Sequence, residues 1–242
     1  DCDIRNDSYI KALEHLEYIA EQPVNTFSEN AVLKASQISE RLKMYENAYR
    51  HYKSLEQLAE SNININIAHE GQMNNSFRID NYEHAIDAAK KMLKNEKVTS
   101  EQSQRAHYIL AKSYFATGQS KDAANEFSIV DGLTTNEQGA ESKYYLAYIA
   151  FENGDYENAE NIIFELTEEY ASYDYWVAKA FILLSDVYLK LDNTFQAKQT
   201  LQSIIDNYSG EDLRNLAKEN LRQIIESENA EMPADTVDTE EF

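Results

Sequence analysis

The sequence predicts an all-α fold in which about six antiparallel helical hairpins stack side by side and a final helix caps the array. The chain has 242 residues but only six glycines and two prolines, too few turn residues for a β-sandwich or a β-barrel. A motif containing alanine recurs every 36 to 38 residues, at Ala12, Ala48, Ala85, Ala123, Ala159 and Ala197. Hydrophobic residues make up 43% of the chain, which is enough to build a packed core.

Each repeat has the same plan of a helix, a tight turn and a second helix. A small residue precedes the turn, as Ala111, Ala147 and Ser185 do, and allows two crossing helix axes to approach to about 8–10 Å. Gly118 and Gly154 mark the turn in the clearest copies, and apolar residues at helical spacing follow it. Because one hairpin cannot bury its apolar faces alone, we expect neighbouring hairpins to share a continuous core.

The elements follow in chain order from the repeated motif. Its copies begin at Ser8, Met44, Asn81, Gln119, Asp155 and Asn193, and the third repeat is degenerate around Gln72 and Met73. We place the six repeats at residues 8–27, 29–62, 66–98, 104–134, 140–172 and 178–208.

Two segments follow the repeats. The apolar stripe of Leu213, Leu216, Ala217, Leu221 and Ile224 predicts a capping helix over 212–226, so the folded array spans 1–227. Residues 226–242 hold seven acids and no base, and we expect 228–242 to be a disordered acidic tail. The alternative is an acidic peptide that docks on a basic partner.

The charge of the chain disfavours several functions. With 43 acids against 22 bases, the net charge of -21 repels nucleic acid and anionic lipid. The longest apolar run, 180–184, is far shorter than the roughly 18 residues that a membrane span needs. The single cysteine, Cys2, excludes an intramolecular disulfide, and we expect it to be an incidental thiol. Because the sequence begins at Asp1 without Met, we expect a processed or truncated chain.

The sequence contains no motif typical of catalysis. The five histidines lack the spacing of a metalloprotease helix, and no glycine-rich phosphate loop or nucleophile elbow is present. Paired carboxylates such as Glu168 and Glu169 are expected on solvated helix faces in so acidic a chain. We therefore expect a non-enzymatic protein with no cofactor and no metal site.

The repeats resemble a known family. The pattern of Leu110, Ala111, Tyr114, Gly118, Ala123 and Phe127, repeated as Leu146, Ala147, Gly154, Tyr156 and Ala159, resembles tetratricopeptide repeats over roughly residues 8–208. The repeats exceed the usual length of about 34 residues and lack the closing proline. The resemblance implies a right-handed α-α superhelix. The long repeats are similar to those of periplasmic and outer-membrane-assembly tetratricopeptide proteins of Gram-negative bacteria, which implies a periplasmic or cell-envelope location, with a cytoplasmic one as the alternative.

The first helices of such hairpins line a concave groove where a peptide or protein partner binds. When these helices are aligned by the repeat, aromatic and basic residues fall on the side expected to face the groove. The Phe column is Phe77, Phe115 and Phe151, the tyrosines are Tyr108, Tyr144 and Tyr148, and the bases are Arg41, Arg78, Arg105, Lys112, Lys179 and Lys190. For the Phe column, packing between helices is the stronger alternative, whereas we expect the Tyr rings to be exposed in the groove. A carboxylate clamp for a chaperone C-terminus is disfavoured, because Ile109 stands where a base would follow Arg105.

The sequence thus predicts a protein-protein interaction scaffold with a partly basic, aromatic groove for a peptide or protein. The alternative hypothesis is a peptide-sensing regulatory module that controls an effector domain absent from this chain.

Overall fold

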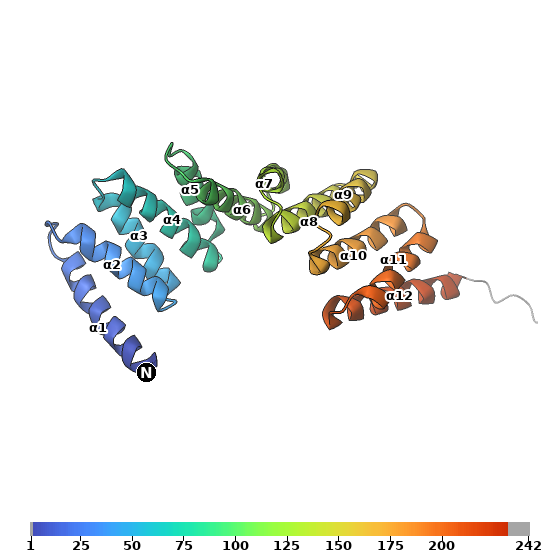
Figure 1. The fold of residues 1–242 in the computed structure, drawn as a ribbon, viewed down its shortest axis with the longest axis horizontal. Coiled ribbons are helices and arrows are strands. Elements are labelled where there is room, and N and C mark those ends of the chain that lie inside the picture. The colour runs from blue at the N-terminus through green and yellow to red at the C-terminus, as the bar shows by residue number, and fades with distance from the viewer. Residues whose placement is uncertain (1, 232–242) are drawn as a thin grey trace, which may run out of the picture. The chain divides into compact units, whose positions relative to one another are not determined.

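The computed structural model describes residues 2–231, with side chains described for 8–230. Within residues 2–231 the chain forms twelve α-helices and no strand, which confirms the all-α prediction (Figure 1). The backbone divides into two compact units, Asp1–Val130 and Asp131–Phe242, which we call the N-terminal unit and the C-terminal unit.

The N-terminal unit contains a single helix followed by helical hairpins. Its helices are α1 (Cys2–Glu21), α2 (Ser28–Arg41), α3 (Tyr45–Leu58), α4 (Asn62–Arg78), α5 (Tyr82–Leu93), α6 (Ser100–Ala116) and α7 (Ser120–Leu133), the last of which ends just beyond the unit. Consecutive helices pack against each other from the pair of α1 and α2 through the pair of α5 and α6. One core cluster, around Val32, Tyr52 and Leu55, joins α2, α3 and α4.

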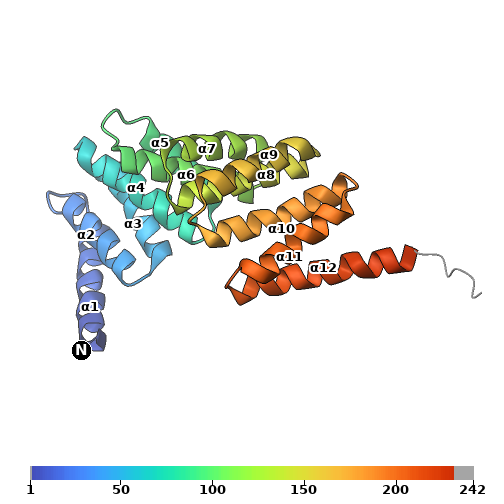
Figure 2. The same cartoon turned by 45° about the vertical axis from the view of Figure 1, so that its right-hand side comes forward.

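The C-terminal unit contains two hairpins and a terminal helix. They are α8 (Glu137–Glu152) with α9 (Tyr156–Glu169), α10 (Asp174–Lys190) with α11 (Thr194–Asn207), and α12 (Glu211–Glu231), which packs against α11 (Figure 2). One core cluster lies around Ile163, Leu166 and Trp176, and a second joins α10, α11 and α12.

The repeated small residues hold the helix pairs together, as their spacing predicts. Each second helix from α3 to α11 places its register alanine in full burial: Ala48, Ala85, Ala123, Ala159 and Ala197. The small residues of the first helices, Ala111, Ala147 and Ser185, are buried as well. Close approach of the paired helices is therefore the structural reason for the alanine repeat.

All five hairpin turns share one backbone geometry. The second residue after each first helix has positive φ: Gly118 and Gly154 at 74° and 77°, and Lys43, Asp80 and Asp192 at 59°, 56° and 55°. In each turn, the next amide donates to a carbonyl five residues back, as Gln119 N does to Tyr114 O at 2.8 Å. This is the hydrogen bond of a Schellman motif. The turns recur in all five hairpins, although glycine marks only two of them.

The structure differs from the predicted boundaries at both ends. Residues 8–27, expected to be the first repeat, contain only the larger part of α1 and the loop that leads to α2, because about 20 residues fill a single helix of about 30 Å. The terminal helix was expected to end at 226, but α12 continues to Glu231 because no glycine or proline interrupts it before Pro233. The predicted tail beyond 231 lies outside the described residues.

Candidate functional site

The arginines predicted for the groove in the N-terminal unit contact neighbouring side chains. The Arg41 guanidinium lies 4.6 Å from the ring centroid of Tyr9, and the Arg78 guanidinium lies 4.9 Å from that of Tyr45. The two pairs occupy the same register one repeat apart, so this cation–π contact is itself a repeated feature. These arginines therefore help to join successive helices.

Arg105 also forms a hydrogen bond within the N-terminal unit. Its Nε donates to Asn74 Oδ1 at 2.6 Å, which links α6 to α4. Tyr108 and Lys112 follow it on α6 and are half-buried.

The two groove phenylalanines predicted in the N-terminal unit, Phe77 and Phe115, pack within their own hairpins. Phe77 is half-buried and meets Tyr82 edge-on, with ring centroids 6.0 Å apart. Phe115 is half-buried and meets Phe127 in the same way at 6.4 Å. Each contact joins the first helix of a hairpin to the second, so these rings contribute to hairpin packing, the stronger alternative from the sequence.

In the C-terminal unit, Tyr144 is the centre of an aromatic cluster between α8 and α10. Its ring centroid lies 5.5 Å from that of Tyr145, 6.4 Å from Tyr148 and 5.6 Å from Trp176. Tyr144 is only 8% exposed, so the expectation that it is exposed in the groove is wrong. Tyr144 is buried because Trp176 on α10, the first helix of the next hairpin, packs against its ring.

Burial also acts on the phenols of two of the three tyrosines on α8, Tyr144 and Tyr148. It raises the pKa of Tyr144, and the charges of neighbouring groups raise it further. Burial likewise raises the pKa of Tyr148, which is half-buried, with Glu152 adding to the shift. Both phenols are neutral at physiological pH and keep a hydroxyl that can donate or accept a hydrogen bond.

Lys179 lies over this aromatic cluster from α10. Its Nζ is 4.8 Å from the ring centroid of Tyr144, 5.0 Å from that of Trp176 and 5.7 Å from that of Tyr175. Three rings around one ammonium show that this surface stabilises a positive charge.

The remaining predicted residues of the C-terminal unit lie near the ends of the first helices. Phe151 is half-buried, with its ring 5.6 Å from that of Tyr156, and Lys190 is exposed at the end of α10.

One stripe of α10 is exposed at its two ends and buried at its middle residue, Ile182. Tyr175, Lys179, Ile182, Asp186 and Leu189 are spaced by four and three residues and so share one side of the helix. Tyr175 is 40% exposed and Leu189 is 36% exposed at the two ends of the stripe. We call this stripe, together with Tyr144 and Tyr148 of α8, the α8–α10 face.

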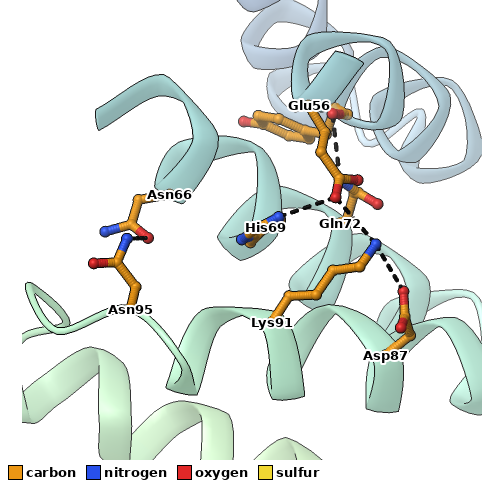
Figure 3. Close-up of polar contacts among 8 residues, drawn as sticks. Glu56, Asn66, His69, Gln72, Asp87, Lys91 and Asn95 are labelled. Carbon is orange, nitrogen blue, oxygen red and sulfur yellow. Dashed lines mark hydrogen bonds and ion pairs between the residues drawn. The ribbon is translucent and has the colours of Figure 1, made fainter. Parts of the chain in front are cut away.

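A polar network that the sequence did not reveal joins three helices of the N-terminal unit (Figure 3). Glu56 of α3 accepts hydrogen bonds from His69 Nε2 at 3.0 Å, Gln72 Nε2 at 2.9 Å and Lys91 Nζ at 3.0 Å. Burial opposes ionisation of this carboxylate, but the three donors outweigh it and lower the pKa of Glu56. The network holds α4 and α5 to α3.

A second such network surrounds Lys143 in the C-terminal unit. The buried ammonium lies 3.1 Å from Asp131, 2.9 Å from Glu165 and 3.2 Å from Glu169. Burial alone would lower the pKa of Lys143, but these carboxylates raise it. The Tyr170 hydroxyl donates to Asp131 at 2.7 Å and completes the network.

The polar contacts between repeats of the N-terminal unit could have been predicted by pairing polar residues that lie one repeat length apart in the sequence. Glu56 of α3 and Lys91 of α5 are 35 residues apart, about one repeat, and their side chains meet at 3.0 Å. Two further pairs, Glu29 with Asn64 and Glu40 with Asn75, have the same separation.

Neither a metal centre nor a membrane span is found in the part of the chain that the structure describes. No group of three or more His, Cys, Asp or Glu side chains there is arranged to hold a metal ion. No helix between Cys2 and Glu231 combines the length and the apolar content needed to cross a membrane.

Known proteins support the family resemblance. The family model of the tetratricopeptide repeat matches residues 179–210, which cover most of the hairpin of α10 and α11. No curated protein sequence matches the chain.

Solved structures share the fold. The chain is similar to YrrB, a TPR protein with an unusual peptide-binding site, at 19% identity and a TM-score of 0.61, over 88% of this chain and 99% of YrrB. A tetratricopeptide repeat protein from Parabacteroides merdae ATCC 43184 matches at 14% identity and a TM-score of 0.59, over 93% and 84% of the two chains. The apo form of RapI matches at 14% identity and a TM-score of 0.56, over 93% and 92%. These likenesses show a TPR-like helical fold and support the tetratricopeptide assignment.

Proposed function

We propose that the chain is a non-enzymatic interaction scaffold that binds a peptide or a protein segment on the first-helix surfaces of its hairpins. The observation that carries the proposal is the α8–α10 face, where exposed Tyr175 and Leu189 flank the aromatic cluster under Lys179. Large apolar and aromatic side chains beside polar groups are typical of the energetic centres of protein interfaces. YrrB, which has the same fold, is a protein with a peptide-binding site, and this supports the proposal.

The scaffold can be tested by exchanging exposed apolar side chains on the two kinds of helix. One variant carries Tyr175→Ala and Leu189→Ala on α10, and the matched control carries Phe164→Ala on α9 and Phe195→Ala on α11, also exposed. The measurement is capture of a binding partner from the source cells, with thermal unfolding of each variant. We expect the α10 variant to lose the captured protein and the control to retain it, with both melting close to wild type.

The opposite pattern would refute the assignment of the binding surface. If the α9 and α11 variant loses the partner and the α10 variant does not, the second helices bind. A cell-envelope location belongs to the same proposal and rests on the resemblance of the long repeats alone. Fractionation of the source cells tests it, and recovery of the chain only in the cytoplasm would contradict it.

A further inference from the structure

A polar hollow of about 410 Å³ opens beside the α8–α10 face, within the C-terminal unit. It lies between the second half of α10, the start of α11 and the second half of α12. Its polar lining includes Ser185, Asp186, Asn220, Gln223 and Glu228, and Leu189 and Ile224 provide its apolar part. The hollow has the size of a ligand pocket but a more polar lining than most, which suits a ligand group that forms several hydrogen bonds.

Ser185 is the first sign that the hollow takes a ligand. The residue is only 1% exposed, and its Oγ has no hydrogen-bond partner among the described residues. A buried hydroxyl without a partner is unfavourable, and native proteins satisfy most such groups. Because Ser185 lines the hollow, a donor placed there would complete its hydrogen bonding.

Asp186 is the second sign. Its carboxylate is half-buried and makes no hydrogen bond or ion pair with any residue between 8 and 230. Burial raises the pKa of Asp186, and the positive charge of Lys190, one turn along α10, offsets this only in part. A positive group inside the hollow would compensate this charge.

The other carboxylate of the hollow is already paired. Lys198 Nζ donates to both carboxylate oxygens of Glu228 at 2.7 Å. Asp186 therefore remains as the anchor for an added cation, and the side-chain oxygens of Asn220 and Gln223 are further acceptors.

We infer that the hollow is the binding site for an arginine side chain of the partner segment. A planar guanidinium presents five donors and suits a carboxylate flanked by a hydroxyl and two amides better than a single ammonium does. Leu189 can cover the aliphatic part of the side chain. A basic segment also complements a chain with a net charge of -21. This inference rests on the proposed scaffold function and names the chemistry of its partner.

The test uses an arginine side chain and its neutral isostere. The full chain, labelled with ¹⁵N, is titrated with N-acetyl-arginine amide and with N-acetyl-citrulline amide, and chemical shifts are followed by NMR. Asp186→Asn is the test variant, and Ser185→Ala provides a second one. Asp192→Asn is the matched control, because it removes an exposed carboxylate six residues away that does not line the hollow.

We expect saturable shifts of amides around Ser185, Asp186, Asn220 and Gln223 with the arginine compound and none with citrulline. Loss of a charged hydrogen-bonded pair should weaken binding by about tenfold or more in Asp186→Asn, and Asp192→Asn should bind as wild type does. Shifts scattered over the acidic surface, or equal affinity of the Asp186 variant and wild type, would overturn the site.

The two proposals fail in different ways. If the wild-type chain and Asp186→Asn capture the same partner equally, the scaffold stands and the arginine site is wrong. If the arginine compound binds in the hollow but Tyr175→Ala, which changes the face outside the hollow, leaves capture intact, the site stands and the proposed binding face is wrong.

Discussion

Gly71 tests how closely the first and second helices pack in the N-terminal unit. It lies inside α4, and a Cβ added there would come within 3.0 Å of three ring atoms of Tyr52 on α3. Tyr52 is buried, and its hydroxyl donates to Glu40 at 2.8 Å, so the ring cannot turn away without breaking that bond. We predict that Gly71→Ala destabilises the protein, although alanine favours a helix.

Two opposing effects set the size of this change. Alanine in place of glycine inside a helix stabilises by about 1 kcal/mol. Overpacking a closed interface typically costs about 1–3 kcal/mol, and the overlap with Tyr52 places this site at the upper end. The expected net loss is therefore about 1–2 kcal/mol in the free energy of unfolding.

The assay is guanidinium unfolding followed by far-UV circular dichroism. The matched control is Gly132→Ala in α7, where an added Cβ meets nothing within 4 Å and should stabilise slightly. In the background of Tyr52→Leu, Gly71→Ala should cost less, because the ring is gone. If Gly71→Ala is as stable as Gly132→Ala, the close contact between α3 and α4 is wrong.

Two further predictions concern polar and backbone features. Burial raises the pKa of Glu56 by less than its three donors lower it, so the free energy of unfolding should fall as the pH drops below 4.5, the ordinary pKa of a glutamate. Glu56→Gln should make this fall shallower in pH-dependent unfolding and should cost about 1–2 kcal/mol at neutral pH. The control Glu60→Gln, which changes an exposed side chain, should do neither. A Glu56→Gln curve with the wild-type pH dependence would contradict the network. Lys43 has φ of 59°, so Lys43→Gly should remove about 1 kcal/mol of backbone strain and raise the midpoint of unfolding. Lys34→Gly, inside α2, should lower the midpoint instead. A lower midpoint in both variants would argue against the turn geometry.

The sequence predicts the hairpins well because their packing depends on small residues. An alanine at each helix crossing can be read from its spacing, and the structure buries all five from Ala48 to Ala197. Three turns were less visible, because Lys43, Asp80 and Asp192 adopt the conformation in which glycine is the usual signal. α1 was mistaken for a repeat because it carries the motif of a second helix at Ala12.

The predicted site illustrates what spacing cannot resolve. Arg41 and Arg78 occupy the same register position in successive repeats, but their contacts with Tyr9 and Tyr45 depend on the crossing of neighbouring helices. Tyr144 was expected to be exposed, and its burial depends on Trp176 of the next hairpin. The cell-envelope location and the regulatory-sensor alternative stay predictions.

The hydrogen bonds between residues one repeat apart mean that the hairpins of the N-terminal unit pack correctly only in their native order. Glu40 binds the amide of Asn75 at 2.7 Å, and Ser113 holds the same register position in the following repeat. Excising one repeat would place a shorter hydroxyl opposite Glu40, whereas two apolar surfaces would tolerate such an exchange. Polar contacts one repeat apart, such as those of Glu29, Glu40 and Glu56, therefore make neighbouring hairpins of this unit specific for each other and not interchangeable.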